Sequence, residues 1–590
     1  MTQVLGRVLL LDGTTMYGRE LIGNKGASVA TMRSLGLPVP PAFVLPIEEC
    51  RRFHAGDERL DDELWQAVLE ALGQLEQDTG RRLGDQDSPL LVSVRSGAAV
   101  SMPGMMDTIL NLGMTDDVEH GLARLSEDPA FAQQTHARFC HEFGQIVLGA
   151  DLDPRGPDAT AADIRRAVLA DTGREVPADP YQQLEAAILA VFGSWSSRRA
   201  IAYRRHWGIP EHGERSGTAV IVQAMVFGNL GQQSGTGVLF TRDPMSGELL
   251  PYGEWLAGGQ GEDVVSGTCD PLPLSALRDD LPQLHAQLLE AASSLEREHR
   301  DVQDIEFTVE RGQLYLLQAR AAKRSPLAAV RVAAELVAEG VIDVDTALAR
   351  VTPEQVQSVL MPQLPSSASN DATVLARGTP ACPGVATGCV VSDASAAEAL
   401  EGDAVLVRPT TSPEDVAGMI AATAVVTERG GATSHAAVVT RALGRPSVVG
   451  VGENETAGWE GREVTVDGSA GIVYAGVLPT RAADAADVPG LVELAGWARE
   501  RSPVTLGDAS ADVLDLDAEG IRLEPGHRPD VESLADVMRG AFAVSGSVLG
   551  SAEGALAVVR SGVPTVIPLA GQRSEVLLLR LAQASQDLGP

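Results

Sequence analysis

The segment QDIEFTVERGQLYLLQAR, residues 303–320, constrains the fold of this chain more than any other because its polarity alternates around a turn signal. Side chains alternate between the two faces of a β-strand. Asp304, Glu306 and Thr308 therefore share one face, and the residues between them form an apolar face. The Arg311–Gly312 pair marks the turn. The segment predicts an antiparallel hairpin with one polar and one apolar face.

The register of this hairpin decides which polar groups meet. A two-residue turn would place Gln318 and Arg320 on the apolar face. A three-residue turn, from Arg311 to Gln313, is favoured because it keeps polar groups together. It predicts three cross-strand pairs: Glu306 with Gln318, Asp304 with Arg320, and Phe307 with Leu317. Two carboxylates on one face suit Mg²⁺ bound to nucleotide phosphates. A solvated face with a cross-strand ion pair is the alternative.

Two earlier segments carry groups suited to an anion, although no GxxxxGK[ST] motif occurs. GNKGASVATMRSLGLPVP places Lys25, one of two lysines in the chain, at a helix start that offers free N–H groups. LLVSVRSGAAVSMPGMMDT places Arg95 on a strand before a loop of small residues. Glycine-rich loops within 235–267 add further polar residues: Arg242, Asp243, Glu254, Gln260 and Glu262. Each segment alone also fits an ordinary helix start or turn.

The segment TERGGATSHAAVVTRAL, residues 427–443, predicts a strand, a turn and a helix that begins near His435. Gly430 and Gly431 turn the chain, and Thr433 or Ser434 can cap the helix. A phosphoryl group on the imidazole would be stabilised by the helix dipole and by free N–H groups. Neutral imidazole is also a competent nucleophile. The alternative is a histidine at a helix start without chemistry.

Composition narrows the class of protein. The net charge of −34 argues against binding to nucleic acid or to an anionic membrane, because like charges repel. The apolar stretches are shorter than the ~20 residues that span a bilayer, and the N-terminus lacks a clear signal-peptide cleavage site. The five cysteines form no CxxC pair, so neither a zinc site nor a disulfide framework is indicated. We expect a soluble, cytoplasmic protein.

Together these motifs resemble the phosphoenolpyruvate-utilising enzymes. GGATSHAAVVTRALGRPSV is similar to their phosphohistidine segment. SVRSGAAVSMPGMMDTILNLGM resembles pyruvate, phosphate dikinase rather than pyruvate, water dikinase. The resemblance covers roughly residues 20–480 and implies an α/β multidomain fold. That fold combines an ATP-grasp nucleotide-binding domain with a swivelling α/β phosphohistidine domain and a short α/β C-terminal remnant.

The resemblance also implies domain boundaries. An ATP-grasp domain is expected over 1–340, a helical and polar linker over 341–374, a phosphohistidine domain over 375–480 and a C-terminal region over 481–590. Family members continue into a β/α barrel that binds phosphoenolpyruvate or pyruvate, and such a barrel needs ~250 residues. LDAEGIRLEPGHRP resembles the opening of that barrel without its phosphate-binding arginine. We therefore expect that this chain alone does not make phosphoenolpyruvate.

The roles of individual residues follow from the same resemblance. His435 would carry the phosphoryl group, and Asp304 with Glu306 would bind Mg²⁺. ATP would be bound by Lys25, Arg95, Ser101, Met102, Asp304, Glu306, Gln318 and Arg320. The phosphohistidine loop would be supported by Gly430, Gly431, Thr433 and Ser434. Thr433 also matches a position at which some members are regulated by phosphorylation.

The predicted function is that of a dikinase-type phosphotransferase. ATP would phosphorylate His435, with AMP and pyrophosphate as products and phosphate as the second substrate. The phosphoryl group would pass to pyruvate or to another acceptor, and a separate chain would supply the acceptor site. A separately encoded barrel could rebuild full dikinase activity. The alternative is a non-catalytic ATP sensor or partner-binding protein descended from the dikinase.

Overall fold

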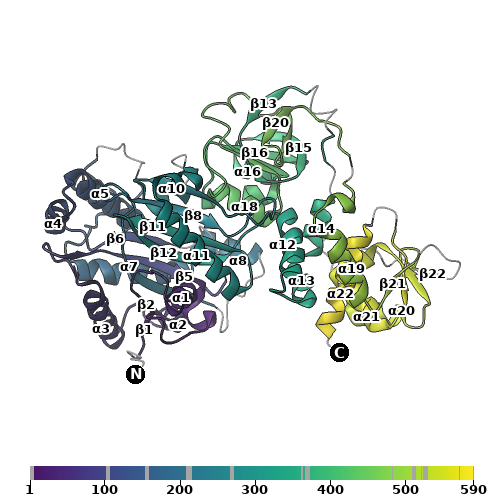
Figure 1. Ribbon diagram of the computed structural model, residues 1–590, viewed down its shortest axis with the longest axis horizontal. Coiled ribbons are helices and arrows are strands. Elements are labelled where there is room, and N and C mark those ends of the chain that lie inside the picture. Colours follow the sequence, from purple (N-terminus) through teal and green to yellow (C-terminus); the bar gives the residue numbers. More distant parts are fainter. Residues whose placement is uncertain are drawn as a thin grey trace.

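The structure is a computed structural model, and Figure 1 shows its three bodies. The largest body holds the first half of the chain. A second body, drawn in green, lies above it, and a third contains the C-terminus. The structure describes residues 6–100, 107–152, 159–206, 216–265, 271–360, 363–365, 372–481, 483–507, 513–519, 521, 529–569 and 572–588.

The largest body contains two five-stranded sheets whose neighbouring strands are all antiparallel. The first has the order β1 (Leu9–Leu10), β2 (Ala42–Leu45), β7 (Ala219–Ala224), β5 (Val92–Gly97) and β6 (Thr108–Leu112). The second has the order β10 (Leu272–Pro273), β9 (Tyr252–Ala257), β8 (Gly235–Phe240), β11 (Gln303–Glu310) and β12 (Gln313–Ala321). A separate parallel pair joins β3 (Arg82–Leu83) to β4 (Pro89–Leu90).

Helices pack around both sheets. One helix, α1 (Arg19–Ser34), contacts β5 and β7 of the first sheet and β12 of the second. The Ser28 hydroxyl accepts a hydrogen bond from the Ala319 N–H at 2.7 Å, so α1 joins the two sheets. The other helices of this body are α2 (Ile47–Ala55), α3 (Asp62–Thr79), α4 (Asp116–Ser126), α5 (Pro129–Ile146), α6 (Ala161–Thr172), α7 (Pro180–Ser194), α8 (Arg198–His206), α9 (Gly261–Val265), α10 (Ser275–Asp280) and α11 (Pro282–His299).

Apolar residues recur at helical spacing over 180–206 and predict one long helix, but the structure has two, α7 and α8. The break follows Ser194, where the backbone turns through two serines. The Ser197 hydroxyl accepts from the Ala200 N–H at 3.3 Å and starts α8. Arg204 Nη1 donates to the Trp195 carbonyl at 2.7 Å, and its guanidinium lies over the Trp195 ring. Serine competes with helical hydrogen bonding, which explains the interruption.

The hairpin β11–β12 has the predicted polar pairs but a different turn. Its turn is the two-residue pair Arg311–Gly312, with φ values of 49° and 78°. A β-bulge after Glu306 then shifts the register, so Glu306 pairs with Gln318 and Asp304 with Arg320, as predicted. The predicted pairing of Phe307 with Leu317 is wrong, because Phe307 pairs with Leu316. A tight turn and one extra residue produce the polar face that a wider turn was expected to give.

The second body is built on an eight-stranded mixed sheet, called here the mobile unit (residues 374–475). Its order is β13 (Val374–Arg377), β20 (Ile472–Ala475), β19 (Glu463–Asp467), β15 (Val385–Val391), β16 (Ala404–Arg408), β17 (Ala424–Thr427), β18 (Ser447–Val449) and β14 (Thr379–Cys382). Its helices are α16 (Ala394–Ala399), α17 (Val416–Ala421) and α18 (His435–Leu443). The first strand pairs with the last, so the unit begins and ends at the same edge.

The third body combines two distant parts of the chain. Helices α12 (Pro326–Ala338), α13 (Val344–Arg350) and α14 (Pro353–Val359) share one hydrophobic core with α19 (Leu491–Arg501) and α22 (Ser574–Leu588). We call these five helices the helical hub. Beside it lies a parallel sheet with the order β21 (Thr505–Leu506), β24 (Thr565–Val566), β23 (Ala543–Ser545) and β22 (Val513–Asp515). This sheet packs with α20 (Val531–Met538) and α21 (Ala552–Ser561).

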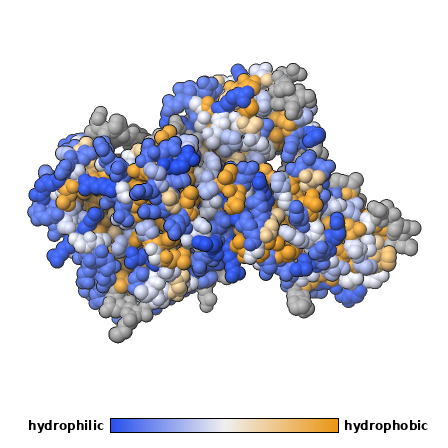
Figure 2. All heavy atoms as spheres, viewed as in Figure 1, coloured by the Kyte–Doolittle hydropathy of each residue, from blue (hydrophilic) through white to orange (hydrophobic). Residues whose placement is uncertain are grey.

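The predicted α/β class is confirmed by these sheets and helices. The hub core crosses the predicted boundaries at 340 and 480, which remain predictions. In the ranges that the structure describes, no helix has both the length and the apolar character that crossing a membrane requires. On the face drawn in Figure 2, hydrophilic residues dominate the largest body and hydrophobic residues are scattered among them.

Candidate functional site

A close approach of two backbone segments brings Lys25 to the end of β5. Helix α1 is interrupted at Gly23, whose φ is 69°. A Cβ atom on Gly23 would lie 1.9 Å from the Gly97 carbonyl oxygen, so only glycine fits there. The Asn24 N–H donates to the Ala98 carbonyl at 2.9 Å. The helix resumes after this kink, and Lys25 lies in its first turn, as predicted.

Arg95 links the first sheet to the hairpin of the second. Its Nη2 atom lies 3.3 Å from Glu306 Oε2 and 3.3 Å from Gln318 Oε1. Arg320 Nε donates to Asp304 Oδ2 at 2.8 Å. Five of the predicted ATP-binding residues therefore lie in one cluster. We call these five residues and Lys25 the cradle: Lys25, Arg95, Asp304, Glu306, Gln318 and Arg320.

The charges of the cradle act strongly on Lys25. Burial, followed by the positive charges of Arg95 and Arg320, lowers the pKa of Lys25 to about 7, and the Glu306 carboxylate only partly opposes them. The side chain of Lys25 therefore gains or loses its proton near neutral pH. An anion placed beside it would restore the charge.

The two carboxylates of the cradle differ in character. Burial raises the pKa of Asp304 although the charge of Arg320 opposes it. Burial also opposes ionisation of Glu306, but Arg95, Arg320 and Lys25 outweigh it and lower its pKa. Asp304 Oδ1 is buried and has no hydrogen-bond partner among the described residues.

Asp304 and Glu306 could hold a divalent cation only together with oxygen ligands from a nucleotide or from water. No group of three or more histidine, cysteine or acidic side chains suited to a metal occurs within the described ranges. Mg²⁺ commonly binds one or two carboxylates and completes its shell with phosphate oxygens and water. Asp304, with its unpartnered oxygen, and Glu306 meet that requirement, so the chemistry of the donors fits a metal held jointly with a nucleotide.

His435 is the first residue of α18, and its two ring nitrogens differ. Nδ1 lies 3.2 Å from the Thr411 hydroxyl. Nε2 is buried and has no partner in the described part of the chain. Burial lowers the pKa of His435 and the charge of Asp415 only partly opposes this, so the neutral ring is favoured. Ser434 caps α18 by accepting a hydrogen bond from the Ala437 N–H. Thr433, the other predicted cap, instead donates its hydroxyl to Glu254.

The loop before His435 is docked on the second sheet. The Ala432 N–H donates to Glu254 Oε1 at 3.0 Å, and the Thr433 hydroxyl donates to the same carboxylate. A Cβ atom on Gly431 would lie 2.4 Å from Glu254 Oε1, so glycine permits this approach. Figure 1 shows α18 on the side of the mobile unit that faces β8. Burial raises the pKa of Glu254, although its bond from Thr433 opposes that rise.

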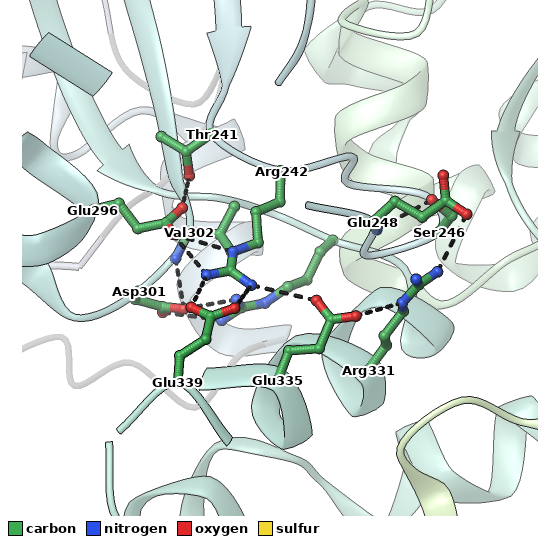
Figure 3. Close-up of polar contacts among 11 residues, drawn as sticks. Thr241, Arg242, Ser246, Glu248, Glu296, Asp301, Val302, Arg331, Glu335 and Glu339 are labelled. Carbon is green, nitrogen blue, oxygen red and sulfur yellow. Dashed lines mark hydrogen bonds and ion pairs between the residues drawn. The ribbon is translucent and has the colours of Figure 1, made fainter. Parts of the chain in front are cut away.

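Arg242, one of the polar residues predicted for the glycine-rich loops, lies in an ion-pair network just beyond the C-terminal end of β8. Its side chain is 1% exposed, and Nη2 lies 2.8 Å from Glu296 and 2.7 Å from Glu339. Glu335 lies 3.3 Å from Nη1 (Figure 3). This network ties the end of β8 to α11 and α12. Ser101 and Met102, two of the predicted ATP ligands, lie outside the described residues.

Sequence reasoning missed the contacts of three side chains, of which Thr411 and Arg441 lie near His435 and the second sheet and Arg138 lies beside the glycine-rich segment. Thr411 belongs to the ordinary-looking segment RPTTSPED and carries no motif of its own. Arg441 follows His435 by six residues, and its proximity to the second sheet depends on docking. Arg138 lies on α5, and its Nη1 donates to Gln260 at 3.1 Å and pairs with Asp263. Only the glycine-rich segment around Gln260 gave a signal that polar groups gather there.

Comparison with known proteins finds the same two parts. Residues 56–284 match the family described as pyruvate phosphate dikinase, AMP/ATP-binding domain. Residues 400–471 match the family described as PEP-utilising enzyme, mobile domain.

Three pyruvate, phosphate dikinases illustrate the similarity. The chloroplastic protein of Mesembryanthemum crystallinum is 43% identical over 78% of this chain and 52% of its own length. The Clostridium symbiosum protein is 41% identical over 86% of this chain and 62% of its own. The Entamoeba histolytica protein is 40% identical over 87% and 62%. The chain thus spans about half to three fifths of these relatives. It belongs to the phosphoenolpyruvate-utilising enzymes and is similar to their pyruvate, phosphate dikinases over the nucleotide-binding and mobile domains.

Proposed function

We propose that this chain is a pyruvate, phosphate dikinase-like phosphotransferase that phosphorylates its own His435 from ATP. One observation carries the proposal: the loop of His435, with its Nε2 unpartnered, is docked on the sheet that holds the cradle. Lys25, Arg95 and Arg320 offer positive charge to the phosphates, and Gln318 adds an amide. Proximity of nucleophile and donor supplies a large part of the catalysis in such transfers.

The imidazole is the nucleophile in this proposal. With Nδ1–H donating to Thr411, Nε2 keeps its lone pair and attacks the β-phosphorus of ATP. The bond from that phosphorus to the oxygen bridging the α-phosphate breaks, and AMP leaves with that oxygen. The terminal phosphoryl group then passes to inorganic phosphate, pyrophosphate leaves, and one phosphoryl group stays on Nε2.

Asp304 and Glu306 would hold a divalent cation, for which we propose Mg²⁺. When bound, the cation would neutralise charge on the phosphates. The Asp304 carboxylate must then be ionised, although burial raises its pKa, and a cation beside it would favour ionisation.

The fate of the phosphoryl group is a further part of the proposal. Pyruvate, or another acceptor on a separate chain, would receive it in the cytoplasm. Thr433 remains a proposed regulatory position. Because its hydroxyl donates to Glu254, a phosphate on Thr433 would place two like charges together and oppose docking.

The test is incubation with Mg²⁺ and ATP labelled at the β-phosphate, with and without phosphate. We expect acid-labile label on the wild type and release of AMP, and neither in His435→Ala. The control is His120→Ala, which removes an exposed histidine of the largest body. Binding of ATP without label would reject the transferase and favour the nucleotide sensor.

A further inference from the structure

Arg441, in the last turn of α18, is a buried cation with unused donors. Its side chain is 2% exposed. Nη1 donates to the carbonyl oxygens of Ala432 at 2.7 Å and Ala381 at 3.2 Å, both within the mobile unit. Nε and Nη2 are buried without a partner among the residues described. Buried charged donors without an acceptor cost free energy. These two N–H groups therefore call for an acceptor that the described chain does not supply.

The two unused donors form one edge of the guanidinium plane. Along that edge the N–H bonds of Nε and Nη2 run nearly parallel, which matches two oxygens of a phosphoryl or carboxylate group. The bonds from Nη1 to two backbone carbonyls hold the plane in place. The free edge is therefore oriented before any ligand arrives.

Arg441 lies where the mobile unit meets the second sheet. Its guanidinium carbon is 5.7 Å from the centre of the Phe240 ring on β8. Phe240 pairs in register with Asp304 of the cradle. The charges of Asp304 and Glu254 act on Arg441, yet neither carboxylate bonds to its free edge. Asp304 Oδ1 is likewise without a partner in the described structure. Unused donors of Arg441 on the mobile unit and an unused acceptor of Asp304 on the second sheet therefore lie on the two sides of the docked interface.

We propose that Arg441 binds the phosphoryl group in transit, with Nε and Nη2 donating to two of its oxygens while the mobile unit is docked. This inference rests on the proposed function and assigns the ligand of an arginine that moves with His435. Because the contact exists only in the docked arrangement, it lowers the barrier to transfer more than it strengthens nucleotide binding. Losing one such oxyanion donor typically slows transfer by about 10²–10³-fold.

The first test compares Arg441→Lys with Arg445→Lys in the labelling reaction. Lysine keeps the positive charge at 441 but lacks the fork. Arg445 is the matched control because its Nη2 also donates to a backbone carbonyl of the mobile unit, that of Ile420. We expect labelling to slow about 100-fold in Arg441→Lys, with half-saturation by ATP changed by about threefold or less. Arg445→Lys should match the wild type.

Chemical rescue separates the fork from a structural role. Arg441→Ala removes the side chain, and millimolar guanidinium should restore part of its labelling rate while an equal concentration of ammonium should not. A purely structural arginine would show no such selectivity. Labelling by Arg441→Lys at the wild-type rate would overturn the inference and leave the proposed function intact.

A second measurement does not depend on transfer. Spin labels carried by unnatural amino acids at Glu290 and Glu460, both exposed, report the distance between the largest body and the mobile unit. A non-hydrolysable ATP analogue with Mg²⁺ should favour the docked distance in the wild type and Arg445→Lys, but not in Arg441→Lys. Failure of the wild type to become labelled would reject the proposed function. Even then, loss of the analogue-induced docked distance in Arg441→Lys alone would support phosphate binding by Nε and Nη2 of Arg441. An equal response in all three proteins would overturn it.

Discussion

At the scale of single residues, the reactivity proposed for His435 depends on a hydroxyl group 24 residues away in the sequence. A neutral imidazole has one N–H, and whichever nitrogen carries it cannot act as the nucleophile. In the proposed tautomer, Nδ1–H donates to the Thr411 hydroxyl and Nε2 keeps its lone pair. Burial further favours the neutral ring by lowering the pKa of His435.

Replacing Thr411 therefore tests the orientation of the ring. We expect Thr411→Val, which keeps the shape and removes the hydroxyl, to slow labelling of His435 by about 10-fold or more, as for loss of one oriented hydrogen bond. Thr411→Ser should retain most of the rate. Thr410→Val, at the neighbouring threonine, is the control. Equal rates in Thr411→Val and the wild type would show that the ring is oriented by other contacts.

Lys25 gives a pH-dependent prediction. With a pKa of about 7, the side chain is largely neutral at pH 8 and charged at pH 6 in the free protein. Binding of an anionic nucleotide favours the charged form, so binding at pH 8 should take up about one proton and binding at pH 6 almost none. Calorimetry in two buffers of different ionisation enthalpy measures this uptake. Lys25→Arg, which stays charged, should abolish it, and unchanged uptake would assign the proton to another group.

The predictability of these residues differs for a physical reason. Lys25, Arg95 and His435 lie in short segments whose glycines and caps are local signals. The contacts of Thr411 and Arg441 depend on tertiary packing, and no local pattern encodes those. Thr411 meets His435 through the fold of the mobile unit itself, and Arg441 meets Phe240 only where the mobile unit packs on the second sheet.

At the scale of elements, the hairpin shows how far alternation of polarity can be trusted. The alternation of polarity correctly predicted that Glu306 pairs with Gln318, because placing either polar group on the apolar face would cost free energy. It could not locate the extra residue, since a wider turn and a tight turn with a bulge give the same pairs farther along the strands. The positive φ angles of Arg311 and Gly312 favour the tight turn.

The network around Arg242 is the strongest polar link between elements that the close-up shows (Figure 3). Replacing Arg242 with methionine would leave Glu296 and Glu339 facing each other without their shared cation. We expect a loss of stability of roughly 3–5 kcal/mol, as for removal of one partner from a buried ion pair. Urea unfolding followed by fluorescence measures it. The control is Arg331→Met, at a more exposed arginine that pairs with Glu335, for which roughly 0–1 kcal/mol is expected. Equal losses of stability in Arg242→Met and Arg331→Met would mean that the burial of Arg242 does not increase its contribution to the free energy of unfolding.

At the scale of the whole molecule, the described residues make few polar contacts between the mobile unit and the second sheet, and Glu254 accepts two of them. Few contacts would suit the proposed transfer, in which the unit leaves one site to reach another. The charge of the same carboxylate also acts on Arg441, where it opposes in small part the effect of burial.

Reversing the charge of Glu254 should therefore open the molecule. We expect Glu254→Lys to increase the radius of gyration in small-angle scattering and to slow His435 labelling by about 100-fold, while ATP affinity changes by about threefold or less. Glu248→Lys is the control, because Glu248 pairs with Arg331 and not with the mobile unit. A closed, fully active Glu254→Lys protein would contradict a docking role for this contact.

The helical hub has a consequence for the order in which the chain is made. Helices α12–α14 find their apolar partners on α19 and α22, some 150 to 250 residues later, and the two connecting segments meet where Gln363 pairs with Arg481. A ribosome therefore completes the mobile unit before the hub can close its core, and domains generally fold as they emerge. The nascent chain holds an exposed apolar surface during that interval, and we expect chaperones to meet this protein there first.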